Sequence, residues 1–245
     1  MASANIRRKN LQMSDAFILS LVISFSGGLQ DAYTYMVRGH VFANAQTGNV
    51  VLMSTGLMSG DAESAFKYLL PILFFAIGVF TAENIGYRFR NGRRLHWRQG
   101  ILILEILIMF IAGLMPAEMN TAANVLISMA CAMQVQSFRK VHGNSYASTM
   151  CIGNLRSGTA ALSAFIRDKD REELKRVKYY FGVIAIFALG AGTGSLLSGV
   201  FHERTIWLSC VILFAGVLLM AVRPEDNEIY INRNDNEMKS INERK

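Results

Sequence analysis

The chain is poor in charged residues, which make up 18% of its 245 residues, whereas soluble domains carry roughly 25%. Apolar residues account for 52% even before the 20 glycines are counted, and the mean hydropathy is +0.28. A soluble globule of this size needs more polar surface than such a composition supplies. The composition therefore argues against a soluble enzyme.

Cysteine and histidine are also scarce. The three cysteines lie inside apolar stretches and form no CxxC pair, so neither a disulfide framework nor a thiolate metal site is expected. The four histidines stand at segment ends without HxxxH or HxxE spacing. Because no carboxylate pair, metal cluster or nucleophile–base pair is recognisable, we expect no metal, no cofactor and no enzymatic activity.

Long apolar runs dominate the chain instead. A bilayer core about 30 Å thick needs roughly 20 helical residues. Six segments meet this requirement, namely 16–37, 68–87, 99–115, 121–138, 179–200 and 205–222. Two further segments are weaker candidates: 44–59 is short, and 146–166 carries Arg156 at its centre.

Basic residues are clustered between the apolar runs, as in multi-pass membrane proteins whose Lys and Arg remain cytoplasmic. The net charge of +7 thus indicates a membrane and not nucleic acid. Basic clusters at 7–9 and 88–98 place both of these points in the cytoplasm, which requires an even number of crossings between them. Three apolar segments lie there, so segment 44–59 must enter and leave on one membrane face. Basic flanks on both sides of 146–166 require the same re-entry there. The segments 1–15 and 223–245 are expected to be cytoplasmic.

The two halves of the chain resemble each other. Gly48-Asn49 and Gly153-Asn154 are 105 residues apart, and Asp31 and Gln136 precede them at equal spacing. Each half, 16–115 and 121–222, contributes three crossings and one half-helix, so the second copy is inverted, as in many secondary transporters. The sequence predicts an all-α membrane protein with about six transmembrane helices, two re-entrant half-helices and an inverted 3+3 repeat.

Three stretches resemble a known family: GGLQDAYTY from Gly27, VFANAQTGNVV from Val41 and AMQVQSFRKVHGNSYASTMCIGN from Ala132. They are similar to the YoaK-like family of bacterial multi-pass inner-membrane proteins. The resemblance covers nearly the whole chain and implies a cytoplasmic-membrane location. It implies no activity, so function has to be argued from the residues.

Polar residues at membrane depth are the candidate substrate-binding residues. Thr47 is expected to cap the first half-helix, whose free amides would present positive charge to a cavity. Asn49, Asn154 and Arg156 complete an anion-binding pocket in this interpretation. In the alternative, these groups only satisfy broken backbone, and Arg156 reaches the cytoplasmic headgroups.

Asp31 lies deep in the first predicted helix, either as a proton-coupling carboxylate or as the salt-bridge partner of Arg156. Gln30 and Gln136 are expected to line the same cavity. The other two membrane carboxylates, Glu83 and Glu105, are expected to form interfacial ion pairs with nearby arginines.

Three alternate glycines, Gly190, Gly192 and Gly194, superficially resemble a dinucleotide-binding loop. No strand precedes them, and small residues four apart are typical of closely packed membrane helices. The pattern therefore predicts helix packing.

These features favour a small secondary transporter or permease for an anionic or polar solute, which would bind between the two halves. The alternative is a non-transporting accessory or lipid-interacting scaffold protein. The expected partners are the lipid bilayer and a small solute, and the small-residue faces are compatible with a homodimer.

Overall fold

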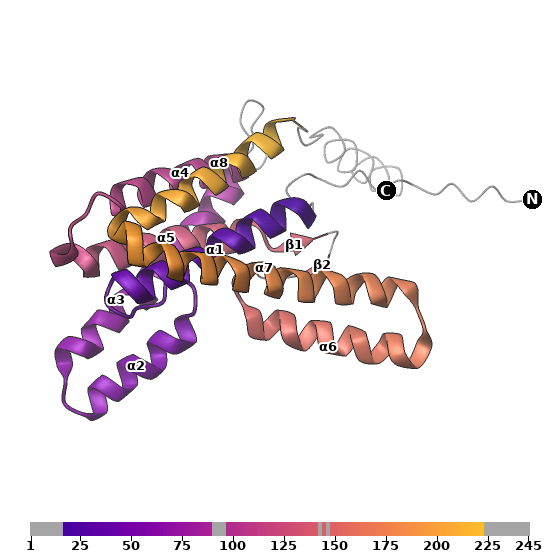
Figure 1. The fold of residues 1–245 in the computed structure, drawn as a ribbon, viewed down its shortest axis with the longest axis horizontal. Helices are drawn as coiled ribbons and strands as arrows, with labels where there is room; N and C mark the ends of the chain where they lie inside the picture. The colour runs from indigo at the N-terminus through magenta and orange to yellow at the C-terminus, as the bar shows by residue number, and fades with distance from the viewer. Residues whose placement is uncertain (1–16, 90–96, 142–143, 146–147, 223–245) are drawn as a thin grey trace, which may run out of the picture.

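The computed structural model describes residues 17–89, 97–141, 144–145 and 148–222. The predicted cytoplasmic segments 1–15 and 223–245 lie outside these ranges. Within them the chain is almost entirely helical (Figure 1), and its one extended pairing is a hairpin of β1 (Lys140–Val141) and β2 (Asn144–Ser145). The helices are α1 (Phe17–Val37), α2 (Gln46–Met58), α3 (Ala62–Phe89), α4 (Trp97–Ala112), α5 (Asn120–Ser137), α6 (Cys151–Asp168), α7 (Arg171–Phe201) and α8 (Ile206–Val222), with 3₁₀ turns η2 (Ala117–Met119) and η3 (His202–Thr205).

Each of the six long apolar segments coincides with a helix, and the two weaker ones form α2 and α6. α3 and α7 begin several residues before the apolar runs that predicted them. An aspartate explains each extension, because Asp61 accepts a hydrogen bond from the Ser64 amide at 3.0 Å and Asp170 accepts one from the Glu172 amide at 2.9 Å. Such caps stabilise polar first turns that hydropathy does not detect.

Four helices, α1, α4, α5 and α8, form a central bundle around one apolar core that includes Leu102, Met109, Ile127 and Leu213. Two antiparallel arms project from this bundle, one formed by α2 with the first part of α3 and the other by α6 with the first part of α7 (Figure 1). The amino end of each short helix lies near the bundle, and its carboxyl end lies at the tip of an arm.

The second half of the chain repeats the packing of the first. α1 packs along α7 and α8 just as α5 packs along α3 and α4, and the α2–α3 arm is matched by the α6–α7 arm. Every buried residue of α5 has a buried counterpart 104 residues earlier, in α1. In the arms, the buried Asn49 and Gly56 of α2 correspond to the buried Asn154 and Ala161 of α6, 105 residues later.

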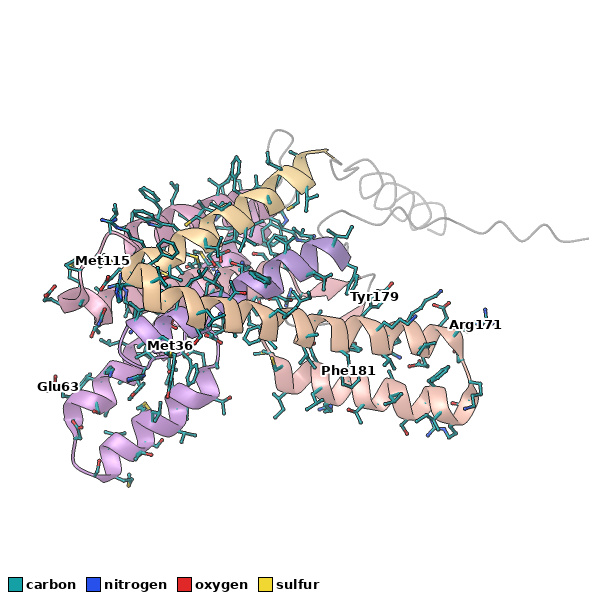
Figure 2. The ribbon with its side chains drawn as sticks, viewed as in Figure 1. Met36, Glu63, Met115, Arg171, Tyr179 and Phe181 are labelled. Carbon is teal, nitrogen blue, oxygen red and sulfur yellow. The ribbon has the colours of Figure 1, made fainter. Side chains whose placement is uncertain are left out.

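Two segments of the described residues are long and apolar enough to cross a membrane: Ala62–Phe89, which is α3, and Arg171–Ala221, which combines α7 and α8. Their outward faces carry large exposed apolar side chains, among them Phe80, Leu196 and Val211. Figure 2 shows such carbon-rich side chains along the outside of the helices. A contiguous apolar exterior of this kind suits contact with lipid.

Glycines bring helices of the two halves into close contact. A Cβ atom on Gly190 of α7 would collide with the carbonyl oxygen of Phe25 in α1, and one on Gly78 of α3 would collide with that of Met129 in α5. The collision thus recurs at positions that correspond between the halves. Gly190 serves helix packing, as the spacing of small residues predicts.

Replacing Gly190 by alanine is expected to lower the free energy of unfolding by about 1–3 kcal/mol, because backbone of α1 would have to move. Gly192 on the same helix is the matched control, since a Cβ atom there meets nothing within 4 Å. Thermal unfolding of both variants in detergent tests the prediction. Equal melting temperatures for the two variants would contradict the close α1–α7 contact.

Candidate functional site

The link between α1 and α2 folds back alongside α1. The backbone amide of Asn44 donates to the Asp31 carboxylate at 2.7 Å, and the Asn44 side chain donates to the Gly27 carbonyl at 3.4 Å. Asp31 lies six residues before the end of α1, which is about 9 Å along the helix. α2 therefore begins alongside α1 and not beyond its end.

Asn49 holds this link in place. Its side chain accepts from the Phe42 amide at 3.0 Å and donates to the Phe42 carbonyl at 2.7 Å and to the Gln46 side chain at 3.0 Å. The side chain is fully buried. Asn49 thus satisfies backbone groups of the non-helical link. This is the structural role that the alternative interpretation of the sequence gave to it.

The prediction that Thr47 caps α2 is wrong. α2 begins at Gln46, so the capping position belongs to Ala45, which makes no side-chain cap, and Thr47 is exposed within the first turn. The carboxylate of Asp31 takes over part of this role from another helix, because it faces the amides of Ala43, Asn44 and Ala45.

α6 begins beside the same turn of α1. The methyl group of Thr149 occupies the space that a Cβ atom on Gly27 would need. Cys151, in the first turn of α6, interacts electrostatically with Asp31. The two short helices therefore start close together, on either side of Gly27 and Asp31.

Two buried oxygen atoms at this junction have no hydrogen-bond partner among the described residues. They are Oδ1 of Asn44 and Oγ of Ser148, and these residues are only 5% and 1% exposed. Unsatisfied buried polar atoms are rare and costly in folded proteins. Their presence beside two helix amino ends, where amides and the helix dipole favour negative charge, marks the junction as a candidate binding site.

Asn154 and Arg156 face opposite ways on α6. Asn154 is buried, whereas Arg156 is exposed. Two residues span about 200° of a helix, so both cannot face inward. Asp31 and Arg156 both lie within the described residues, and no ion pair joins them there, which removes the salt-bridge interpretation of Asp31.

A second buried polar group lies at the centre of the bundle. Glu105 of α4 is fully buried, and its carboxylate accepts hydrogen bonds from Gln30 of α1 at 3.2 Å and from Gln134 of α5 at 2.8 and 2.9 Å. The expected interfacial ion pair of Glu105 is therefore wrong. Gln30 and Gln134 occupy corresponding positions of the two halves, 104 residues apart.

Gln136 lies outside this cluster. It is half-buried and donates to Glu83, which also pairs with Arg139 at 3.4 Å on the exposed surface. Glu83 thus forms an ion pair, as expected, but with Arg139 from the link after α5 and not with an arginine that follows it in the sequence. The sequence did not indicate Gln134. The predicted offset of 105 residues between the halves comes from the short helices α2 and α6, whereas α1 and α5 are related by an offset of 104 residues.

Polar contacts connect the two buried carboxylates. The Cys131 thiol donates to the Oε1 atom of Gln30 at 3.0 Å, and the other end of Gln30 bonds Glu105. The Asn44 side chain also faces Cys131. A chain of buried polar groups therefore runs from Glu105 to the junction at Asp31.

Arg38 is a further buried polar residue that the sequence did not indicate. Its guanidinium is fully buried and donates to the carbonyls of Ala112 and Met115, at 2.7 and 2.9 Å, and to the Tyr33 hydroxyl at 2.7 Å. It therefore closes the carboxyl end of α4, where free carbonyls favour a cation. In the sequence, Arg38 follows an apolar run, as do arginines that flank membrane helices, so its position alone does not indicate burial.

Comparison with known proteins identifies one family and one relative. The model of a family described as "Protein of unknown function (DUF1275)" matches residues 19–219. The UPF0700 transmembrane protein YoaK of Bacillus subtilis (strain 168) is 24% identical over 213 residues, which cover 83% of this chain and 92% of that protein. No solved structure matches.

Proposed function

The chain belongs to the DUF1275 family and is an integral membrane protein, and we propose that it works as a small secondary transporter for an anionic or polar solute. The proposal includes a bacterial cytoplasmic membrane as its location, with both termini cytoplasmic. The observation that carries it is the meeting of the amino ends of α2 and α6 at one buried turn of α1, between the two halves of the protein.

An inverted repeat is part of the proposal. Its support is the equivalence of helix pairings and of buried positions between α1–α4 and α5–α8. With α2 entering from one membrane face and α6 from the other, the arms would lie on opposite sides of a shared site. Rocking of one half against the other then exposes the site alternately to the two faces.

The solute would bind where the two helix amino ends converge. Amides in the first turn of α6 and those of residues 43–45 before α2 would donate hydrogen bonds to the solute, and both helix dipoles favour an anion there. The Ser148 hydroxyl, just before α6, has no partner among the described residues and would supply a further donor, and Asn154 lies in the first turn of α6. The exposed Arg156 and Thr47 stand on the outer faces of these helices, where Arg156 would attract anions.

Transport by purified protein in proteoliposomes tests the proposal. Uptake of labelled sulfate, phosphate or succinate above that of protein-free liposomes is expected. Replacing Ser148 by alanine should lower the apparent affinity about 10- to 150-fold, because a hydrogen bond to a charged group contributes about 1.5–3 kcal/mol.

Ser198 provides the matched control, since it is also buried and its hydroxyl also has no partner, but it lies in α7. The Ser198→Ala variant is expected to transport like the wild type. Equal affinities in both variants would remove Ser148 from the site. Uptake no faster than in protein-free liposomes would favour the alternative, a non-transporting accessory or scaffold protein.

A further inference from the structure

Asp31 occupies the position that an anionic solute would take. Its carboxylate faces the amides of Ala43, Asn44 and Ala45 immediately before α2, and it interacts electrostatically with Cys151 at the start of α6. The side chain is only 6% exposed. The protein thus carries its own anion at the convergence of the two helix amino ends.

No basic side chain among the described residues pairs with this carboxylate. The titratable groups that face it are thiols, Cys131 from α5 and Cys151 from α6. Glu105 of α4 is connected to it only through Gln30 and Cys131. The backbone amides and the two helix dipoles are therefore what balances the charge of Asp31, and a second anion at the same place would meet direct repulsion.

Resting on the proposed function, we propose that the Asp31 carboxylate competes with the transported anion for the same amides. The anion binds only when Asp31 has taken up a proton. The proton is added to a carboxylate oxygen of Asp31. The Asn44 side chain faces this carboxyl with its amide group, and after a flip of that group its Oδ1, which accepts from none of the described residues, takes the hydrogen bond of the neutral carboxyl. The amides that Asp31 releases become available to the solute.

This arrangement couples one proton to one anion. Binding of the anion becomes weaker as pH rises, because ionised Asp31 holds the amides, and stronger as pH falls. Only one half of the protein carries the group, since the position 104 residues after Asp31 is Val135. A single proton therefore accompanies each transport cycle.

The native Cys151 permits a test that needs no knowledge of the solute. It is half-buried in the first turn of α6 beside Asp31. Its rates of modification by an anionic reagent, sulfonatoethyl methanethiosulfonate, and by the cationic trimethylammonium analogue are measured by mass spectrometry at pH 5.5 and pH 8. The ratio of the two rates cancels the thiol's own ionisation and reports how well an anion is accepted at the junction.

For the wild type the anion-to-cation rate ratio is expected to rise as pH falls. In Asp31→Asn the ratio at pH 8 should be about tenfold above the wild-type value, because one nearby negative charge is gone, and it should no longer depend on pH. Asp61→Asn, which neutralises an exposed aspartate outside the junction, should behave like the wild type. A ratio in Asp31→Asn equal to that of the wild type, or an equal rise in Glu105→Gln, would overturn the proposal.

A wild-type ratio that does not change with pH would overturn the proposal too, even if Asp31→Asn fails to fold. Transport adds a separate readout. In liposomes with a trapped pH dye, wild-type uptake of sulfate should acidify the interior, whereas Asp31→Asn should carry sulfate without protons. A pH-dependent rate ratio without any transport would leave the competition by Asp31 intact and refute only the transporter function.

Discussion

Replacing Arg38 by methionine is expected to lower the free energy of unfolding by about 3–5 kcal/mol, the usual cost of removing one partner from a buried charged network. The guanidinium hydrogen-bonds the carbonyls of Ala112 and Met115 and, at 3.0 Å, the side chain of Asn120. Methionine fills a similar volume but donates no hydrogen bond. The Met115 carbonyl would lose the guanidinium and the buried Ala112 carbonyl would keep the Met115 amide at 3.2 Å, and an unsatisfied buried group costs about 1–3 kcal/mol.

The loss should extend to the Arg38→Lys variant, because an ammonium group is a point charge and cannot reach the several acceptors that the planar guanidinium serves. Arg139→Met is the control: Arg139 is exposed and its pair with Glu83 is long, so a change of less than about 1 kcal/mol is expected. Reversible unfolding in mixed micelles measures all three. A loss in Arg38→Met as small as in Arg139→Met would refute the capping role.

Replacing Glu105 by leucine is expected to destabilise the protein by about 2–3 kcal/mol, because it leaves a buried amide donor without an acceptor. The side-chain amide of Gln134 donates to both oxygens of Glu105, while its Oε1 atom already has no partner. Gln134→Leu should also be destabilising, because the buried Glu105 carboxylate loses both hydrogen bonds from Gln134 and keeps the one from Gln30.

The double variant Glu105→Leu/Gln134→Leu should cost at least about 1 kcal/mol less than the sum of the single variants, because residues of one network are not additive and no partner is left unpaired. The same unfolding experiment on all four proteins completes the cycle. Strict additivity would show that the contact between the two side chains contributes nothing.

Much of the helical layout was predictable from residue order. All six apolar segments became helices, although α3 and α7 begin several residues earlier than predicted, and the short 44–59 segment became a helix that starts beside Asp31. These predictions succeed because helix formation and length depend on local hydropathy and on local caps. The helix caps at Asp61 and Asp170 could also be predicted from residue type. Helix bounds set by hydropathy alone leave out the polar first turns that these caps begin.

The candidate site was only partly predictable. Of the predicted substrate-binding residues, Asp31, Asn49 and Asn154 are buried, whereas Arg156 and Thr47 are exposed. Gln134 was missed in favour of Gln136, two residues later, because the spacing of the halves cannot be read to one residue from motifs elsewhere in the chain. A shift of two residues turns a side chain to the other side of the helix.

Residue order alone thus determined a helical membrane protein and predicted two similar halves, because burial of apolar length in lipid is a property of each segment. The fold decides which polar groups contact one another. Glu105 accepts hydrogen bonds from Gln30 and Gln134, and Asp31 accepts one from the link before α2. The physical reason is that lipid is as apolar as a protein core, so a transmembrane helix shows no strong contrast between its inner and outer faces. These partners lie 13 to 75 residues apart and become neighbours only when the helices pack.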